Sequence, residues 1–196
     1  MLFRSTVDEL AGVITPYFTM GFDVLLPEYR GYGRSDGVPS EEAIQQDMLS
    51  FHRQLVARDD IDANCIIYHG RAVGGAIAAK LARLCPPRAM ILESTYSSFA
   101  AMAYQFAAPQ ILVSNPYHTD SAIARLDRPL LIFHGAEDDL IPVTHGRALR
   151  DAASPMLTRY VEYECGHEDF PGMPNRGDYW KQIRNFLGAL GIRPVI

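Results

Sequence analysis

Short apolar runs alternate along this chain with segments in which apolar residues recur at helical spacing. The runs predict five strands, at Phe22–Leu26, Cys65–Tyr68, Ala89–Leu92, Leu130–Phe133 and Arg159–Tyr163. The first four runs are nearly unbroken rather than alternating, which favours strands buried on both faces of a parallel sheet. The intervening periodicity predicts five helices, at Thr6–Phe18, Ser40–Ala57, Val73–Leu84, Thr144–Ala153 and Asp178–Leu190.

The order of these elements predicts the fold class. Strands and helices alternate with short connections, so we expect an α/β fold with a mostly parallel central sheet flanked by helices, in one domain over residues 1–196. Residues 95–128 are irregular, because they are too long for a simple crossover. The apolar stretch Phe99–Ala107 within them forms either a small cap over a pocket or an ordinary packing helix with a loop. The sequence leaves both alternatives open.

Composition and charge argue against several function classes. The formal net charge is -5 and no Lys/Arg-rich run occurs, so nothing in the charge predicts a nucleic-acid partner. No stretch reaches the roughly 18 apolar residues of a membrane helix, so we expect no membrane association and a cytoplasmic location. Cys65, Cys85 and Cys165 are odd in number and lie outside any C-x-x-C or His/Cys cluster, which predicts reduced thiols and no metal site.

A glycine-rich turn follows the second predicted strand and precedes a predicted helix. Its sequence is H-G-R-A-V-G-G, from His69 to Gly75. In this context the pattern G-x-S-x-G is the nucleophile elbow, a turn so sharp that glycine flanks the nucleophile. Gly70 and Gly74 fit the pattern, but Ala72 stands at the position of the serine. Without a hydroxyl group, Ala72 cannot attack a carbonyl or form an acyl-enzyme.

Two later strand ends carry candidate partners for such an elbow. Asp138 follows the fourth predicted strand, where a carboxylate can orient an imidazole and stabilise its charged form; Asp139 is the second candidate. His167 follows the fifth predicted strand and is a candidate general base. Each loop taken alone is more typical of solvated surface residues. The order of elbow, acid and histidine along the chain, however, is the order that α/β-hydrolases use.

The chain resembles the small single-domain α/β-hydrolases over nearly its whole length. The resemblance rests on Y-R-G-Y-G-R-S from Tyr29, G-R-A-V-G-G from Gly70, E-S-T from Glu93, H-G-A-E-D-D-L-I-P from His134 and C-G-H from Cys165. It implies the family's acid role for Asp138, its base role for His167 and a backbone N–H oxyanion donor at Val73. It also implies hydrolysis of an ester, amide or thioester of a small acyl substrate, without a metal or an organic cofactor.

The sequence departs from the family pattern at two points. Ala72 replaces the nucleophile, and no His-Gly-rich turn, which supplies the second oxyanion N–H, precedes the first predicted helix. The resemblance therefore implies that the first strands of the fold are lacking and that a sheet edge is exposed. We expect the chain not to turn over esters by the serine mechanism, because loss of the nucleophile lowers kcat by about six orders of magnitude.

Two interpretations of Ala72 remain open. In the first, the chain belongs to a hydrolase lineage, and Ala72 is either an engineered substitution that traps substrate or an isolated lesion. In the second, the chain is a non-catalytic relative that keeps a pocket for a small ligand or a protein. Cys165 and Ser94 lie outside an elbow, so we expect neither side chain to act as a substitute nucleophile.

Overall fold

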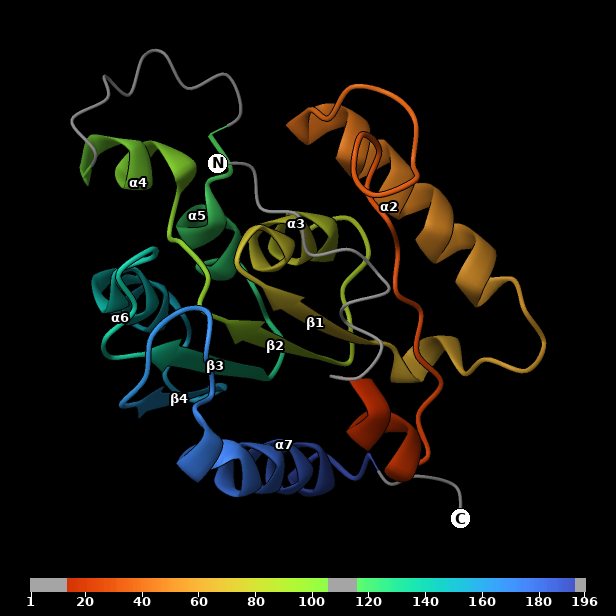
Figure 1. The fold of residues 1–196 in the computed structure, drawn as a ribbon. Coiled ribbons are helices and arrows are strands. Elements are labelled where there is room, and N and C mark those ends of the chain that lie inside the picture. Colours follow the sequence, from red (N-terminus) through yellow and green to blue (C-terminus); the bar gives the residue numbers. More distant parts are fainter. Residues whose placement is uncertain (1–13, 106–115, 193–196) are drawn as a thin grey trace.

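Within residues 14–105 and 116–192, which the computed structural model describes, four parallel strands form a central sheet (Figure 1). The strands are β1 (Ile67–Arg71), β2 (Ala89–Glu93), β3 (Leu130–Gly135) and β4 (Thr158–Tyr163), in the order β1-β2-β3-β4. All neighbouring strands pair in parallel, as predicted. Their carboxyl ends therefore lie on one side of the molecule, and α/β folds gather active groups at the carboxyl ends of their strands.

Helices flank this sheet on both faces. Besides a helical segment at residues 14–19, the described helices are α2 (Glu41–Val56), α3 (Val73–Ala82), α4 (Phe99–Gln105), α5 (Thr119–Ile123), α6 (Val143–Ala152) and α7 (Arg176–Ala189). Ser40 caps α2, since its Oγ accepts a hydrogen bond from the N–H of Ala43 at 3.2 Å. Glu41 and Glu42 lie in the first turn, where the helix dipole stabilises negative charge. The cap motif in the sequence thus fixed the start of this helix correctly.

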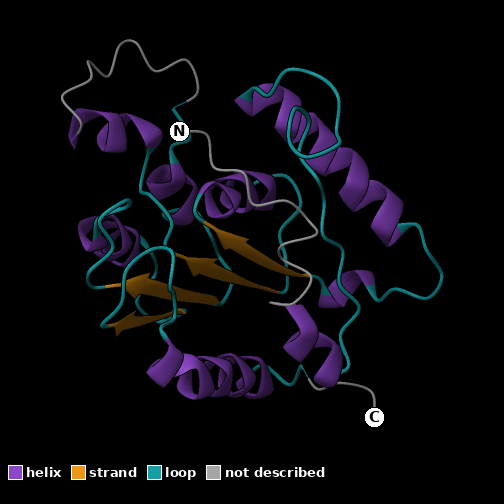
Figure 2. Ribbon diagram, in the orientation of Figure 1, coloured by secondary structure: helices purple, strands orange, loops and turns teal. Residues whose placement is uncertain are grey.

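Strand residues alternate between two cores, one on each face of the sheet. Met90 and Leu92 pack into a core with residues of α3, α5 and α6, whereas Ala89 and Ile91 pack with residues of α7. Figure 2 shows α7 covering one face of the sheet while α3, α5 and α6 cover the other. Because side chains alternate with period two, Glu93 continues the row that faces α7.

The strand predicted at Phe22–Leu26 is wrong, because these residues are neither strand nor helix. A strand needs a neighbour for its hydrogen-bond ladder, and among the described residues β1 pairs only with β2. Phe22 packs against the core on the α7 side, but Leu25 is 49% exposed. The run is therefore not buried on both faces, which its continuous apolar character had suggested.

Three other sequence predictions need adjustment. The second predicted strand starts later, at Ile67, because Ala63–Cys65 forms a 3-10 turn (η1). Of the helix predicted at Thr6–Phe18, residues 14–19 are helical and residues 6–13 lie outside the described residues. In the region 95–128, the apolar stretch Phe99–Ala107 forms the helix α4 as far as Gln105, and residues 106–115 lie outside the described residues. The small cap stays a prediction.

The structure also shows the state of the cysteines and the lengths of the helices. All three cysteines are free thiols; Cys65 is exposed and Cys165 is buried. A second short 3-10 turn, Met173–Asn175 (η3), leads into α7. Within the described ranges, no helix combines the length and the apolar character that crossing a membrane requires.

Candidate active site

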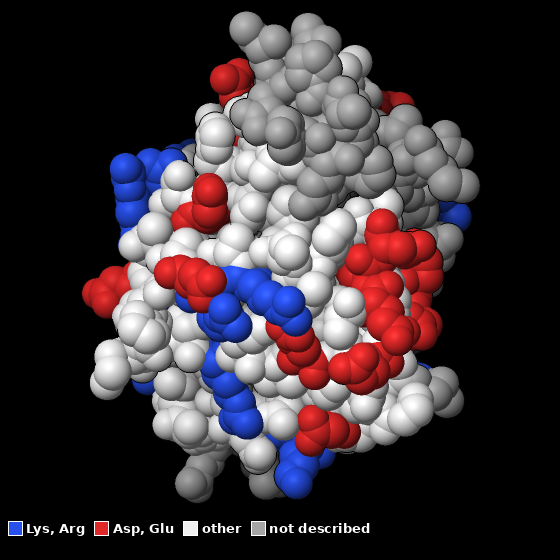
Figure 3. Space-filling model, turned by 90° about the vertical axis from the view of Figure 1, so that its left-hand side faces the viewer, with Lys and Arg blue, Asp and Glu red and all other residues white. Residues whose placement is uncertain are grey.

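The residues singled out in the sequence lie at the carboxyl ends of the strands. Ala72 follows β1, Asp138 follows β3 and His167 follows β4. The strand arrowheads point to the left in Figure 1, and Figure 3 views the molecule from that side. Acidic and basic side chains both occur on this face, and the acidic ones form a group towards its right edge. The parallel sheet thus brings all three candidates to one side of the molecule.

Ala72 occupies a tight turn between β1 and α3. Its φ of 48° and ψ of -117° place it in a conformation that residues with a side chain rarely adopt. The N–H of Ala72 donates to the carbonyl of Glu93 at 2.9 Å, which anchors the turn to β2. A Cβ at Gly70 would lie 2.6 Å from the carbonyl carbon of Gly74, so this close approach requires glycine. The turn between β1 and α3 is therefore sharp, and its glycines allow the strand and the helix to approach closely.

Asp138 and His167 form a buried hydrogen-bonded pair. Asp138 Oδ2 lies 2.8 Å from His167 Nδ1, and each residue is 5% exposed. Asp138 Oδ1 accepts hydrogen bonds from the N–H groups of Leu140 at 3.1 Å and Ile141 at 2.7 Å. Burial raises the pKa of Asp138, but the hydrogen bonds from His167 and Ile141 outweigh it, and the net shift is downward. Asp139, the second candidate acid, is exposed.

An ionised Asp138 selects one tautomer of the neighbouring imidazole. The carboxylate can only accept a hydrogen bond, so Nδ1 of His167 carries the proton. In the neutral ring Nε2 is then the basic nitrogen, as a general base requires.

Two further histidines lie around the same carboxylate. His134 Nε2 is 2.7 Å from the carbonyl of Ile141 and 3.7 Å from Asp138 Oδ2. His145 Nδ1 accepts a hydrogen bond from the N–H of Ser97 at 3.2 Å. Burial lowers the pKa of both His134 and His145, so both rings are neutral at pH 7. Neither ring replaces His167 as the direct partner of Asp138.

The start of α3 carries the predicted oxyanion donor. Val73 is the first residue of the helix, so its N–H has no carbonyl partner within the helix. Tyr29 lies beside the same turn, because its hydroxyl oxygen is 3.3 Å from where a Cβ at Gly74 would be. Burial raises the pKa of Tyr29 to about 12, which keeps this hydroxyl protonated. The sequence analysis did not assign a role to Tyr29.

A buried carboxylate that the sequence analysis also left without a role lies behind the elbow. Glu93 accepts a hydrogen bond from the Tyr179 hydroxyl at 2.8 Å, and its carboxylate lies 3.3 Å from Nε of Arg71. Nη2 of Arg71 donates to the backbone carbonyl of His167 at 2.5 Å. Burial raises the pKa of Glu93, but the hydrogen bond from His69 and the charges of His69 and Arg71 outweigh this effect. The pKa of Glu93 is therefore lowered overall. The available signal was an acidic residue at the end of an otherwise apolar strand.

Other candidate nucleophiles and ligands find little support. Burial, reinforced by the charge of Asp169, raises the pKa of Cys165 to about 11, so its thiol stays protonated. Ser94 is fully buried, and its hydroxyl lacks a hydrogen-bond partner among the described residues. Within residues 14–105 and 116–192, no group of three or more His, Cys, Asp or Glu side chains is arranged to hold a metal ion.

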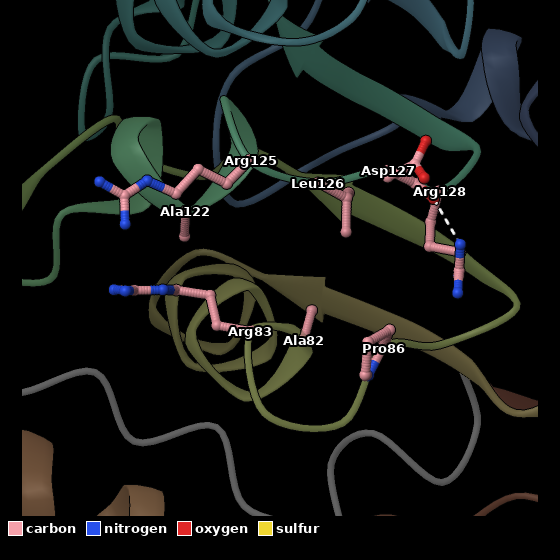
Figure 4. Close-up of a pocket in the computed structure, with 8 residues that line it drawn as sticks. All are labelled: Ala82, Arg83, Pro86, Ala122, Arg125, Leu126, Asp127 and Arg128. Atoms are coloured by element: carbon pink, nitrogen blue, oxygen red, sulfur yellow. Dashed lines mark hydrogen bonds between the residues drawn. The ribbon is translucent and has the colours of Figure 1, made fainter.

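A groove of about 400 Å³ lies at the opposite end of the strands, away from Ala72, Asp138 and His167 (Figure 4). Its walls come from the end of α3 and from the segment between α5 and β3, and they carry Arg83, Arg125 and Arg128. These segments lead into β2 and β3, so the groove opens at the amino ends of the strands. It includes none of the elbow, the acid or the histidine.

A model of the family described as serine aminopeptidase, S33, matches residues 6–116, which is more than half of the chain. The chain belongs to the α/β-hydrolase superfamily. The matched part of this α/β-hydrolase includes the elbow and ends before Asp138 and His167.

Curated relatives extend the likeness beyond that range. The α/β-hydrolase is 34% identical over 171 residues to an uncharacterized protein of Mycobacterium tuberculosis, covering 86% of this chain and 60% of that protein. It is 31% identical over 186 residues to the alpha/beta hydrolase domain-containing protein WAV2 of Arabidopsis thaliana, covering 84% of this chain and 60% of WAV2. The chain thus spans 60% of the length of these relatives.

Solved structures share the fold of this α/β-hydrolase at low sequence identity. A monoacylglycerol lipase of Paleococcus ferrophilus gives a TM-score of 0.70 at 13% identity, covering 94% of this chain and 90% of that one. A hydrolase of Pseudomonas aeruginosa gives 0.68 at 18% identity, covering 93% and 86%. At these identities the likeness establishes the fold alone.

Proposed function

We propose that this chain is a serine-type acyl hydrolase scaffold in which Ala72 removes or strongly impairs catalysis. In the parent arrangement a serine at position 72 would attack the carbonyl carbon of a small ester, amide or thioester. His167 would take the proton of the serine hydroxyl, Asp138 would stabilise the resulting imidazolium, and the N–H of Val73 would donate to the oxyanion. The methyl group of Ala72 cannot perform the first step.

The observation that carries this proposal is the combination of a strained elbow and a complete acid–base pair. Ala72 keeps a φ of 48° although it has no catalytic group to present. The buried Asp138–His167 pair lies at 2.8 Å, and Arg71, which precedes Ala72, contacts the backbone of His167. The proposed site lacks the hydroxyl oxygen that a serine side chain would supply at position 72.

Restoring the hydroxyl with Ala72→Ser tests the proposal. Loss of a nucleophile costs about 10⁶ in kcat, so A72S should hydrolyse p-nitrophenyl butyrate at least about 10³-fold faster than the unchanged chain. The same assay on A72S combined with His167→Ala should return to the background rate. Thermal melting of all three proteins checks that each is folded.

A folded A72S protein that shows no turnover would contradict the hydrolase proposal. Acyl ligand binding that persists in that protein would then support the alternative, a non-catalytic relative that keeps its pocket for a small ligand or a protein. Calorimetry of the unchanged chain with the ester tests whether this chain still binds an acyl ligand. Binding indicates a binding protein, whereas no binding indicates a chain that has lost both catalysis and ligand binding.

A further inference from the structure

We propose that Arg71 and Glu93 position His167, with the Arg71 guanidinium bridging the Glu93 carboxylate and the His167 backbone. The inference rests on the function proposed above, because it assigns a task to two residues that do not touch the reacting atoms. Arg71 immediately precedes Ala72, so the same bridge connects the elbow to the loop that carries the histidine.

The sheet itself places the two partners side by side. Arg71 and Glu93 are paired residues in the parallel register of β1 and β2. Both extend the rows of strand residues that face α7, because Ile67 and Ile91 of the same rows pack into that core. The guanidinium therefore reaches the carboxylate across one strand spacing, with Nε 3.3 Å from Oε1.

Glu93 is held in place by groups on two sides. The Tyr179 hydroxyl of α7 donates to Oε2 at 2.8 Å, and His69 Nε2 lies 3.4 Å from the same atom. His69 Nδ1 lies 2.7 Å from the hydroxyl of Tyr17. The Glu93 side chain is 8% exposed, so its charge needs these partners. This carboxylate is a rigid anchor rather than a mobile surface group.

Arg71 makes a second contact, to the backbone of His167. Nη2 donates to the His167 carbonyl at 2.5 Å, while the imidazole of His167 binds Asp138 at 2.8 Å. The loop is therefore held at the backbone by Arg71 and at the ring by Asp138. A planar guanidinium with five donors can serve both acceptors at once, whereas the single ammonium of lysine is a point charge. Loss of the bridge removes the Arg71 contact to the His167 backbone, while the Asp138 contact to the ring stays in place.

Kinetics in the A72S background provide the first test. Arg71→Met should lower kcat about 10–100-fold with KM changed less than about twofold, because a misplaced base slows chemistry more than binding. Arg71→Lys should recover part of the loss. Arg147→Met is the matched control, since Arg147 makes a bidentate pair with Glu162 at 2.8 Å on another part of the sheet. Its kcat should equal that of A72S.

NMR of the unchanged chain provides a second test that needs no turnover. The Nδ1 proton of His167 should give a low-field resonance, assigned by its disappearance in Asp138→Asn. We expect Arg71→Met to broaden or abolish this resonance and Arg147→Met to retain it. If Arg71→Met fails to fold, the comparison is made with Arg71→Lys.

The two tests separate the proposals. If A72S is inactive but Arg71→Met abolishes the resonance, the hydrolase function fails and the positioning role stands. A resonance that survives Arg71→Met, with kcat within about twofold of A72S, overturns the positioning role even if the melting temperature falls. A drop in kcat equal to that of Arg147→Met would also overturn it.

Discussion

The Nδ1 atom of His167 meets the Oδ2 atom of Asp138 at 2.8 Å although 29 residues separate the two in sequence. The contact exists because β3 and β4 are adjacent and parallel, so the loops that follow them leave the sheet side by side. Asp138 also accepts two backbone N–H groups, so its carboxylate cannot rotate freely. The imidazole is therefore oriented by a group that is itself fixed.

Replacing Asp138 with asparagine should disable a restored nucleophile. The amide can present its NH2 group to Nδ1, which favours the tautomer with the proton on Nε2. In the A72S background, Asp138→Asn should therefore lower kcat by about 10⁴-fold, as the loss of the orienting carboxylate does in serine proteases. Ester hydrolysis measured at saturating substrate checks the prediction, with Asp139→Asn as the control at the exposed neighbour. Equal rates for the two variants would show that Asp138 has no such role.

The two glycines at the start of α3 set how closely the helix approaches β2. A Cβ at Gly75 would lie 2.7 Å from Cγ2 of Thr95, and both residues are buried. We expect Gly75→Ala to lower the free energy of unfolding by about 1–3 kcal/mol through overpacking. Gly188 in α7 meets nothing within 4 Å, so Gly188→Ala should raise it by about 0.5–1 kcal/mol through helix propensity. Urea denaturation measures both, and a Gly75→Ala protein as stable as Gly188→Ala would contradict this account of the elbow.

Buried neutral histidines should make stability fall on mild acidification. Burial lowers the pKa of His134 and His145 below the ordinary value of 6.5, whereas the unfolded chain titrates near that value. Their stabilisation is therefore fully present above pH 6.5 and is lost as the pH falls, because the unfolded state then binds more protons. Asp138, whose pKa is also lowered, stays ionised in this range, and its negative charge acts on both rings.

Urea denaturation at pH 7.5 and pH 5.5 tests this dependence. Each histidine should contribute at most about 1.4 kcal/mol to the loss at the lower pH, which is one pH unit below the unfolded pKa. His145→Gln should reduce the loss, while His118→Gln, at an exposed position, should leave it unchanged. Identical pH dependence in His145→Gln and the unchanged chain would rule out His145 as a contributor.

The sequence indicated which residues follow the strand ends better than it indicated which strand lies at the edge of the sheet. The elbow, Asp138 and His167 each follow a strand, and in a parallel sheet the strand ends converge whatever the details of packing. The segment Phe22–Leu26 was mistaken for a strand because pairing depends on which neighbour is present, and a run of apolar residues carries no information on that. Edge strands and their partners are decided by tertiary contacts.

The Arg71–Glu93 contact lies beyond sequence reasoning for a related reason. It depends on the register between β1 and β2, which pairs these two residues rather than their neighbours. A shift by one residue would turn one of the side chains to the other face of the sheet. Ser94 likewise has a positive φ of 44°, which the sequence does not predict because the residue is neither glycine nor asparagine. Such features become visible only once the strands are aligned.

The burial of Glu93 predicts a large loss of stability when its charge is removed. Glu93→Gln leaves Arg71, whose side chain is 33% exposed, beside a buried neutral amide, so the free energy of unfolding at pH 7 should fall by about 1–3 kcal/mol. Glu162→Gln is the matched control, because Glu162 also pairs with an arginine, Arg147, but at a partly exposed site. Its loss should stay below about 1 kcal/mol.

The pH dependence of the Glu93 effect supplies the second half of that test. The folded pKa of Glu93 is lowered from its ordinary value of 4.5, so its stabilisation is present above that pH and disappears as the pH falls through the folded pKa. In a His69→Gln background, which removes the imidazole 3.4 Å from this carboxylate, the difference between the chain with Glu93 and the Glu93→Gln chain should therefore be constant from pH 8 to 6 and shrink towards acid. Denaturation curves across this range measure it. A difference that grows on acidification would mean that Glu93 is protonated in the folded state, which would remove the anchor on which the bridge to His167 depends.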